Sequence, residues 1–155
     1  MAGLLTHAVR TPDKPALIFG DNGFIETYGE LELRSRRIAL ALTAAGVKPG
    51  DCIAILMSNH PAFFDVYWAT QRLGAYLTPL NWHSDLDELG YVISNSDARV
   101  LIVEAKLTEK AQRLRESADP DLTLFFSVGG ALPDYDRLDR IAEGIPGKDA
   151  TLDER

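Results

Sequence analysis

The sequence predicts an α/β fold, with a mostly parallel sheet covered by helices on both faces and an N-terminal β-hairpin. Short runs that are apolar at every position recur along the chain, the longest at Cys52–Met57 and Val100–Val103. Such runs are typical of strands buried on both faces of a parallel sheet. Segments with helical spacing of apolar residues alternate with them, and glycine or proline stands at most junctions. This alternation predicts parallel strands joined by right-handed crossovers.

The hairpin is predicted from two short apolar segments on either side of a turn. Ala16–Phe19 and Phe24–Thr27 flank Asp21-Asn22-Gly23, whose residue types favour a tight reversal of the chain.

The first long helix is predicted by a capping box. In Thr27-Tyr28-Gly29-Glu30 a hydroxyl and a carboxylate, three residues apart, can satisfy each other's free backbone donors. The helix that follows is expected to end at Gly46. Its predicted apolar stripe consists of Leu31, Ile38, Leu42 and Ala45.

The second cycle begins with the buried strand Cys52–Met57 and a helix started by Pro61, which lacks the N–H that a first helical position leaves unpaired. Phe64, Trp68 and Leu73 are predicted to form part of the apolar face of this helix, which ends at Gly74. Three further strands are predicted, at Tyr76–Leu80, Arg99–Glu104 and Leu122–Val128, and a tight turn at Gly129-Gly130 follows the last of them. A helix capped by Ser84 and Asp87 is predicted to pass through Leu89, Val92 and Ile93, and another helix is predicted at Thr108–Ser117. The last predicted helical stripe consists of Tyr135, Leu138, Ile141 and Ala142. Residues 1–143 are interpreted as one unit and residues 144–155 as a linker or truncated end, because the latter carry no apolar period.

Composition and charge exclude several classes of function. The 155 residues carry a net charge of −7, which disfavours nucleic acid and anionic membrane surfaces as partners. The basic cluster Arg34, Arg36 and Arg37 is expected to be a solvated helix face. Cys52, the single cysteine, excludes an internal disulfide and is expected to be a small core residue.

No segment of the sequence predicts membrane insertion or export. A helix needs about 20 apolar residues to cross a bilayer, and no run approaches that length. The N-terminus lacks the basic and apolar regions of a signal peptide. We therefore expect a cytoplasmic protein without a transmembrane segment.

A search for catalytic motifs in the sequence finds none. There is no G-x-G-x-x-G or G-x-x-x-x-G-K-[ST] loop for phosphates and no G-x-S-x-G nucleophile motif. The three histidines are far apart, and Asp134, Asp136 and Asp139 lack the glycine of a calcium loop, so they are expected to form a charged face. No catalytic residue and no metal ligand is predicted.

Four stretches, in this order, resemble the adenylate-forming superfamily of acyl-CoA synthetases, luciferases and peptide-synthetase adenylation domains. They are Thr27-Tyr28-Gly29-Glu30-Leu31, similar to the first core motif; Gly46–Asp51 with Ile53–Asn59; Arg72–Asn81, similar to the second core motif; and the helix and strand from Asp87 to Ile102. The resemblance implies that this chain is part of a larger adenylate-forming N-terminal domain.

Phe63-Phe64, Trp68 and Asn81-Trp82-His83 look most like the bacterial fatty-acyl-CoA ligase branch. Such enzymes use ATP, Mg²⁺ and CoA to convert a carboxylate into an acyl-adenylate and then a thioester. Their phosphate loop, ending in a lysine, lies downstream of the matched region, and the chain stops at Arg155 without it. The resemblance therefore implies an N-terminal fragment that binds no cofactor alone and is inactive in adenylation.

One residue is a candidate for cofactor binding. His83 follows a predicted strand end, where α/β folds tend to bind ligands, and the resemblance places a basic residue there near the CoA and nucleotide cleft. Asn81 either caps the next turn or touches a substrate. The expected partners are the remainder of the enzyme, or a second copy through exposed apolar surface. The alternatives are a non-catalytic interaction module on the same scaffold and, less favoured, a flavodoxin-like domain.

Overall fold

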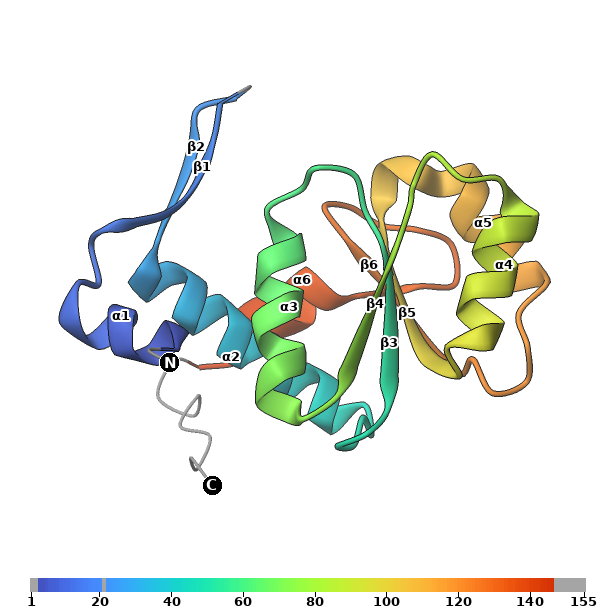
Figure 1. Cartoon of the computed structure of the whole chain (residues 1–155), viewed down its shortest axis with the longest axis horizontal. Coiled ribbons are helices and arrows are strands. Elements are labelled where there is room, and N and C mark those ends of the chain that lie inside the picture. The colour runs from blue at the N-terminus through green and yellow to red at the C-terminus, as the bar shows by residue number, and fades with distance from the viewer. Residues whose placement is uncertain (1–2, 21, 147–155) are drawn as a thin grey trace.

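The structure, a computed structural model, describes residues 3–20 and 22–146. Figure 1 shows a hairpin and a short helix, α1, on one side of a sheet that is flanked by helices. The hairpin pairs β1 (Pro15–Phe19) with β2 (Phe24–Thr27) in antiparallel register, as predicted.

The main sheet has five parallel strands in the order β4-β3-β5-β6-β7. Their bounds are β3 Cys52–Leu56, β4 Tyr76–Leu80, β5 Ala98–Glu104, β6 Leu124–Val128 and β7 Asp136–Arg137. Every residue of β3 is buried, as the continuous apolar run predicts. The predicted parallel α/β sheet is thus confirmed.

Helices cover the two faces of the sheet separately, which confirms the second half of the predicted fold (Figure 1). One face packs against α2 (Tyr28–Ala44), α3 (Ala62–Leu73) and α6 (Leu138–Glu143). The other packs against α4 (Leu86–Asn95) and α5 (Thr108–Glu116), which follows the short 3-10 helix η1 (Ala105–Leu107). Alternate residues of β3 divide between these two cores, since successive side chains of a strand point to opposite faces.

The predicted capping box forms at the start of α2. The hydroxyl of Thr27 accepts from the Glu30 backbone at 3.3 Å, and the Glu30 carboxylate accepts from the Thr27 backbone at 2.8 Å. Gly74 ends α3 in the left-handed conformation, with φ of 63°, the C-terminal signal expected for glycine.

Several boundaries and caps differ from the predictions. Helix α1 (Leu4–Arg10) was not predicted, and α4 is capped by Asp85, whose carboxylate accepts from the Glu88 backbone, instead of by Ser84. Pro61 lies one position before the first helical residue of α3. Tyr135 lies outside α6 and is buried against the opposite core, while Ile141 is exposed.

The hairpin reverses the usual orientation of apolar side chains. Ile18 and Ile25, paired across the strands, are 70% and 56% exposed, whereas Glu26 is fully buried. A buried carboxylate destabilises the fold unless a charge or hydrogen bonds compensate it, so Glu26 requires a positively charged partner or hydrogen-bond donors.

The expectation of a solvated face formed by Arg34, Arg36 and Arg37 is correct only in part, because Arg34 is exposed whereas Arg36 and Arg37 are half-buried. Arg34 forms an ion pair with the buried Glu26 at 3.1 Å, and Arg36 with the buried Glu32 at 2.6 Å. Arg72 of α3 also binds Glu32, which joins the two helices. The acidic partners are buried, so Arg34 links α2 to β2 and Arg72 links α3 to α2, whereas the pair of Arg36 and Glu32 lies within α2.

Cys52 is buried, as predicted for a core residue. Within the described part of the chain, no helix combines the length and apolar character that crossing a membrane requires.

Candidate functional site

The carboxyl ends of β3 and β5 form the topological switch point of the sheet. From β3 the chain leaves to α3 on one face and continues to β4, and from β5 it leaves to α5 on the other face and continues to β6. In open α/β sheets, ligands bind in the crevice outside such a point. The structure contains a cavity of about 800 Å³ there, which we call the carboxyl-edge cavity.

Glu104 and Ser58 fasten these two strand ends together. One carboxylate oxygen of Glu104 accepts from both the backbone N–H and the hydroxyl of Ser58, each at 2.8 Å. Its other oxygen lies 3.1 Å from Nζ of Lys106. Burial alone would raise the pKa of Glu104, but these hydrogen bonds and the ammonium outweigh it and hold the pKa below its ordinary value.

His60 lies in the loop that follows β3 and lines the cavity. Its Nδ1 accepts from the Ala62 backbone at 3.1 Å, so Nε2 carries the proton when the ring is neutral. A Cβ on Gly129 would lie 3.1 Å from this Nε2, which shows how closely the end of β6 approaches the ring. Gly129 also has a φ of +71°, which favours glycine, in agreement with the predicted turn.

The carboxyl groups of Asp65, Asp139 and Glu143 also line the cavity, as do the guanidinium groups of Arg34 and Arg37. Asp139 of α6 is held by Arg137, at 2.6 and 3.1 Å, and by the Arg140 backbone. Burial would raise the pKa of Asp139, but these partners lower it below the ordinary value. The predicted charged face at this aspartate is therefore a set of fixed pairs instead of a freely solvated surface.

Asp65 of α3 and Glu26 of β2 are the buried carboxyl groups on the hairpin side. Asp65 is only 5% exposed, its Oδ1 has no hydrogen-bond partner among residues 3–20 and 22–146, and burial raises its pKa to about 8. Burial also raises the pKa of Glu26, against the attraction of Arg34. Arg37 lines the same cavity, and its buried Nε has no partner either.

His83 lies at the same edge of the sheet, after β4, but does not line the cavity. It is exposed, and its ring lies against Trp82 with 3.7 Å between centroids. Its backbone donates to the Asn81 side chain at 3.1 Å, which confirms that Asn81 caps this turn. The same geometry leaves the His83 side chain free to meet a ligand.

Two lysines, Lys106 of η1 and Lys110 of α5, contact the loop that carries His83. Nζ of Lys110 donates to the carbonyls of Trp82 and Ser84, at 2.6 and 2.7 Å. Nζ of Lys106 lies 5.9 Å from the centroid of the Trp82 ring while it also binds Glu104. Lys106 therefore stands between the His83 loop and the carboxyl-edge cavity.

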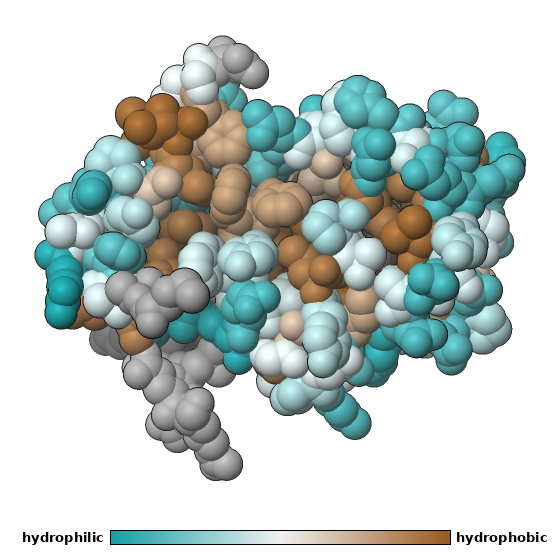
Figure 2. Space-filling view, in the orientation of Figure 1, coloured by the Kyte–Doolittle hydropathy of each residue, from teal (hydrophilic) through white to brown (hydrophobic). Residues whose placement is uncertain are grey.

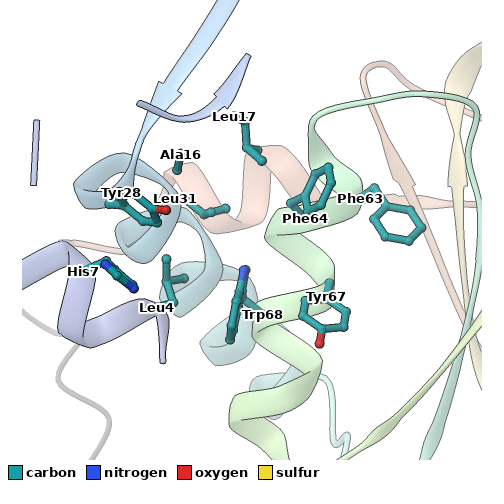
Figure 3. A pocket seen from close by; sticks show the side chains of 10 residues that line it. All are labelled: Leu4, His7, Ala16, Leu17, Tyr28, Leu31, Phe63, Phe64, Tyr67 and Trp68. Atoms are coloured by element: carbon teal, nitrogen blue, oxygen red, sulfur yellow. The ribbon is translucent and has the colours of Figure 1, made fainter. Parts of the chain in front are cut away.

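A second hollow, the aromatic groove, lies between α1, the hairpin, α2 and α3 (Figure 3). It has a volume of about 440 Å³, and its lining residues are Leu4, His7, Ala16, Leu17, Tyr28, Leu31, Phe63, Phe64, Tyr67 and Trp68. Phe64 and Trp68 were predicted to form part of the apolar face of this helix, and they line the groove, while the buried residues of α3 are Asp65, Val66, Ala69 and Thr70. Figure 2 shows the resulting apolar surface between the hairpin and the sheet.

Among residues 3–20 and 22–146, no three His, Cys, Asp or Glu side chains are grouped so that they could hold a metal ion. The residues described here therefore do not fit a Mg²⁺ site by themselves.

The chain belongs to a family of AMP-binding enzymes. The family model, described as "AMP-binding enzyme", matches residues 4–144, which include every strand of the sheet and both hollows described above.

Particular relatives agree with this assignment. A long-chain-fatty-acid–CoA ligase of Mycobacterium tuberculosis, FadD13, is 30% identical over 128 residues, or 83% of this chain and 24% of the relative. A feruloyl-CoA synthase of Amycolatopsis is 45% identical over 76 residues, or 49% of this chain and 16% of the relative. The chain thus spans about a quarter or less of the length of these relatives.

Solved structures show the same architecture. The N-terminal domain of FACL13 from Mycobacterium tuberculosis superposes with a TM-score of 0.81 at 25% identity, covering 93% of this chain and 35% of that one. A benzoate CoA ligase from Burkholderia xenovorans gives 0.75 at 25% identity, covering 91% and 27%. The fold is that of the N-terminal domain of adenylate-forming enzymes.

Proposed function

We propose that this chain is the N-terminal part of an ATP-dependent fatty-acyl-CoA ligase, in which it supplies scaffold and one edge of the ligand cleft. The complete enzyme would use ATP, Mg²⁺ and CoA to convert a carboxylate into an acyl-adenylate and then a thioester. The family match over residues 4–144 carries this proposal. FadD13, named a long-chain-fatty-acid–CoA ligase, aligns with 83% of this chain, and long-chain fatty acid transport protein 6 of Homo sapiens aligns with 78%, which favours a fatty acid as substrate.

The chain alone is proposed to be inactive in adenylation. Its 155 residues contain no glycine-rich phosphate loop ending in a lysine. Phosphoryl and adenylyl chemistry depends on such positioned donors and on a metal ion to stabilise developing charge. Residues 1–143 would then be a partial subdomain; the linker predicted at residues 144–155 falls mostly outside the described residues.

His83 is proposed to contact a phosphate of CoA or of the nucleotide. His83 is exposed after β4, its ring lies against that of Trp82, and Lys106 lies near the Trp82 ring, all of which support this role. An imidazole N–H and an ammonium can both donate to a phosphate, and an aromatic face can accept a base by stacking.

The aromatic groove is proposed to be covered by another polypeptide, either the rest of the enzyme or a second copy of this chain. Phe64 and Tyr67, each 37% exposed, lie beside one another on α3 and form a contiguous apolar surface with the hairpin. The same surface would serve the alternative function, a non-catalytic interaction module.

Pyrophosphate release in the presence of ATP, Mg²⁺ and fatty acids tests the main proposal. The isolated chain should give no release above a buffer blank, whereas a longer polypeptide that includes this region and a phosphate loop should release pyrophosphate in a fatty-acid-dependent manner. Turnover by the isolated chain that survives repurification would refute the scaffold assignment.

A further inference from the structure

Two buried carboxyl groups beneath the hairpin share one arginine. Glu26 of β2 is fully buried and lies 3.1 Å from the guanidinium of Arg34, whose side chain is 46% exposed. Asp65 of α3 is near enough to both for their charges to act on it, Glu26 opposing and Arg34 favouring its ionisation. Two carboxylates and one guanidinium leave this cluster one positive charge short whenever both acids are ionised.

The structure gives this cluster an opening. Asp65 and Arg34 both line the carboxyl-edge cavity, which has a volume of about 800 Å³. Asp65 is only 5% exposed, and its buried Oδ1 has no hydrogen-bond partner among the described residues. Buried polar atoms are nearly always satisfied, so an orphaned carboxylate oxygen beside a cavity points to a missing donor.

The other carboxyl groups that line the cavity already have partners. Glu104 is bound by Ser58 and Lys106, while Asp139 and Glu143 of α6 are bound by Arg137 and Arg140. Arg37 of α2 and His60 of the β3–α3 loop also line the cavity, but neither forms an ion pair with Asp65 among the described residues. Among the described residues that line the cavity, Asp65 is therefore the carboxyl group without a hydrogen-bonded or ion-paired partner, and its charge is uncompensated whenever it is ionised.

We propose that the part of the carboxyl-edge cavity beside Asp65 is a binding site for one organic cation, a guanidinium or primary ammonium group. Its N–H groups would donate to the carboxylate of Asp65, and its charge would balance the second carboxylate of the cluster, as in charge-assisted pairs in general. The group could come from a free small molecule or from a basic side chain of another polypeptide.

The cation binds the ionised carboxylate of Asp65, so binding requires that Asp65 lose its proton. The affinity therefore depends on pH. With a pKa of about 8, Asp65 is mostly protonated at pH 6.5 and mostly ionised at pH 8.5. The ionised fraction, and with it the affinity for a permanent cation, should rise by about twentyfold over this interval. A cation that simply associated with the acidic surface would show no such change, because exposed carboxylates are ionised at both values.

Isothermal titration calorimetry with three probes tests the site, in amine-free buffers at pH 6.5 and 8.5. The probes are butylguanidine, N-acetyl-arginine amide and neutral butylurea. The variants are Asp65→Asn and, as matched control, Asp87→Asn, since Asp87 is exposed on α4 on the opposite face of the sheet. Circular dichroism confirms that each variant is folded, and Glu26→Gln provides a second alteration of the same cluster.

At least one of the two cationic probes should bind the wild type more tightly at pH 8.5, and butylurea should not bind. Asp65→Asn should abolish the pH dependence, Glu26→Gln should weaken binding, and Asp87→Asn should change neither. Preference for N-acetyl-arginine amide would assign the cation to a polypeptide side chain, and preference for butylguanidine to a small molecule. Absence of binding by both cations, or equal binding to Asp65→Asn, would overturn the proposal.

Discussion

The carboxylate of Glu104, at the end of β5, accepts two hydrogen bonds of 2.8 Å from Ser58, at the end of β3. This contact joins strands that lie side by side but are 46 residues apart in sequence, and it fixes the edge on which the carboxyl-edge cavity is built.

Ser58→Ala should destabilise the chain. The substitution removes one hydrogen bond to a charged group, which is worth about 1.5–3 kcal/mol. Because the pKa of Glu104 lies below its ordinary value, the contribution is present above about pH 4.5 and is lost as the pH falls through the folded-state pKa. Urea denaturation at pH 7 and pH 3.5 measures both effects. Ser117→Ala, which removes an exposed hydroxyl on α5, serves as control, and an equal loss there would contradict the argument.

Asp65→Asn should stabilise the chain increasingly as the pH rises. The folded state holds a proton on Asp65 up to about pH 8, whereas the unfolded state releases it near pH 3.8. The contribution of Asp65 to the free energy of unfolding is therefore fully present below pH 3.8, and it decreases by about 1.4 kcal/mol per pH unit as the pH rises toward 8. The difference in unfolding free energy between variant and wild type, measured from pH 5 to 7, should show this slope. A difference that does not vary with pH would mean that Asp65 is ionised in the folded chain.

The regular elements of the sheet could be predicted because their signals are local. A strand buried on both faces must be apolar throughout, as β3 is, and the capping box of Thr27 and Glu30 needs only four consecutive residues. Helix α1 has seven residues and no side-chain cap, so it depends on packing against the rest of the molecule, which a local pattern does not reveal.

The carboxyl-edge cavity could not be predicted in this way. It depends on the strand order β4-β3-β5-β6-β7, which brings the residues after β3, β5 and β6 to one edge. The buried acids were missed for a related reason, since Glu26 and Asp65 are of a residue type normally found at the surface. A carboxylate among the buried positions of α3, one residue before Val66, was the available signal. His83 was placed correctly at a strand end, but its role stays a prediction.

Gly130→Ala should destabilise the chain, although the change adds a single methyl group. A Cβ at Gly130 would lie 2.8 Å from the Cβ of Ala105, so the loops after β5 and β6 would have to separate. Overpacking of this kind costs about 1–3 kcal/mol. Gly90→Ala is the matched control, because it lies within α4 with nothing within 4 Å of the new atom and should stabilise by up to about 1 kcal/mol. Thermal unfolding of both variants should shift in opposite directions, and a shift in the same direction would contradict the steric argument.

His83→Ala should weaken the use of CoA or ATP in an active ligase that contains this region. Loss of one hydrogen bond to a phosphate is expected to raise the corresponding KM by about ten- to a hundredfold. His7→Ala is a suitable control, since His7 stacks on Tyr28 in the aromatic groove, away from the carboxyl edge. Steady-state kinetics with each substrate varied in turn measure the effect. Unchanged constants for both substrates would leave His83 as an exposed loop residue.

The isolated chain should self-associate through the aromatic groove. Phe64 and Tyr67 are each 37% exposed, and Ile18 and Ile25 of the neighbouring hairpin are 70% and 56% exposed. Contiguous apolar surface of more than a few hundred Å² is uncommon on monomeric proteins and marks interaction sites. Light scattering over a concentration series should show an increasing mean mass, and a hydrophobic dye should bind.

The double variant Phe64→Ser, Tyr67→Ser should reduce both signals. Tyr91→Ser, on α4 and 68% exposed, should not, because it lies on the opposite face of the sheet. A monodisperse wild-type monomer that binds no dye at high concentration would show that no partner is needed to cover this groove.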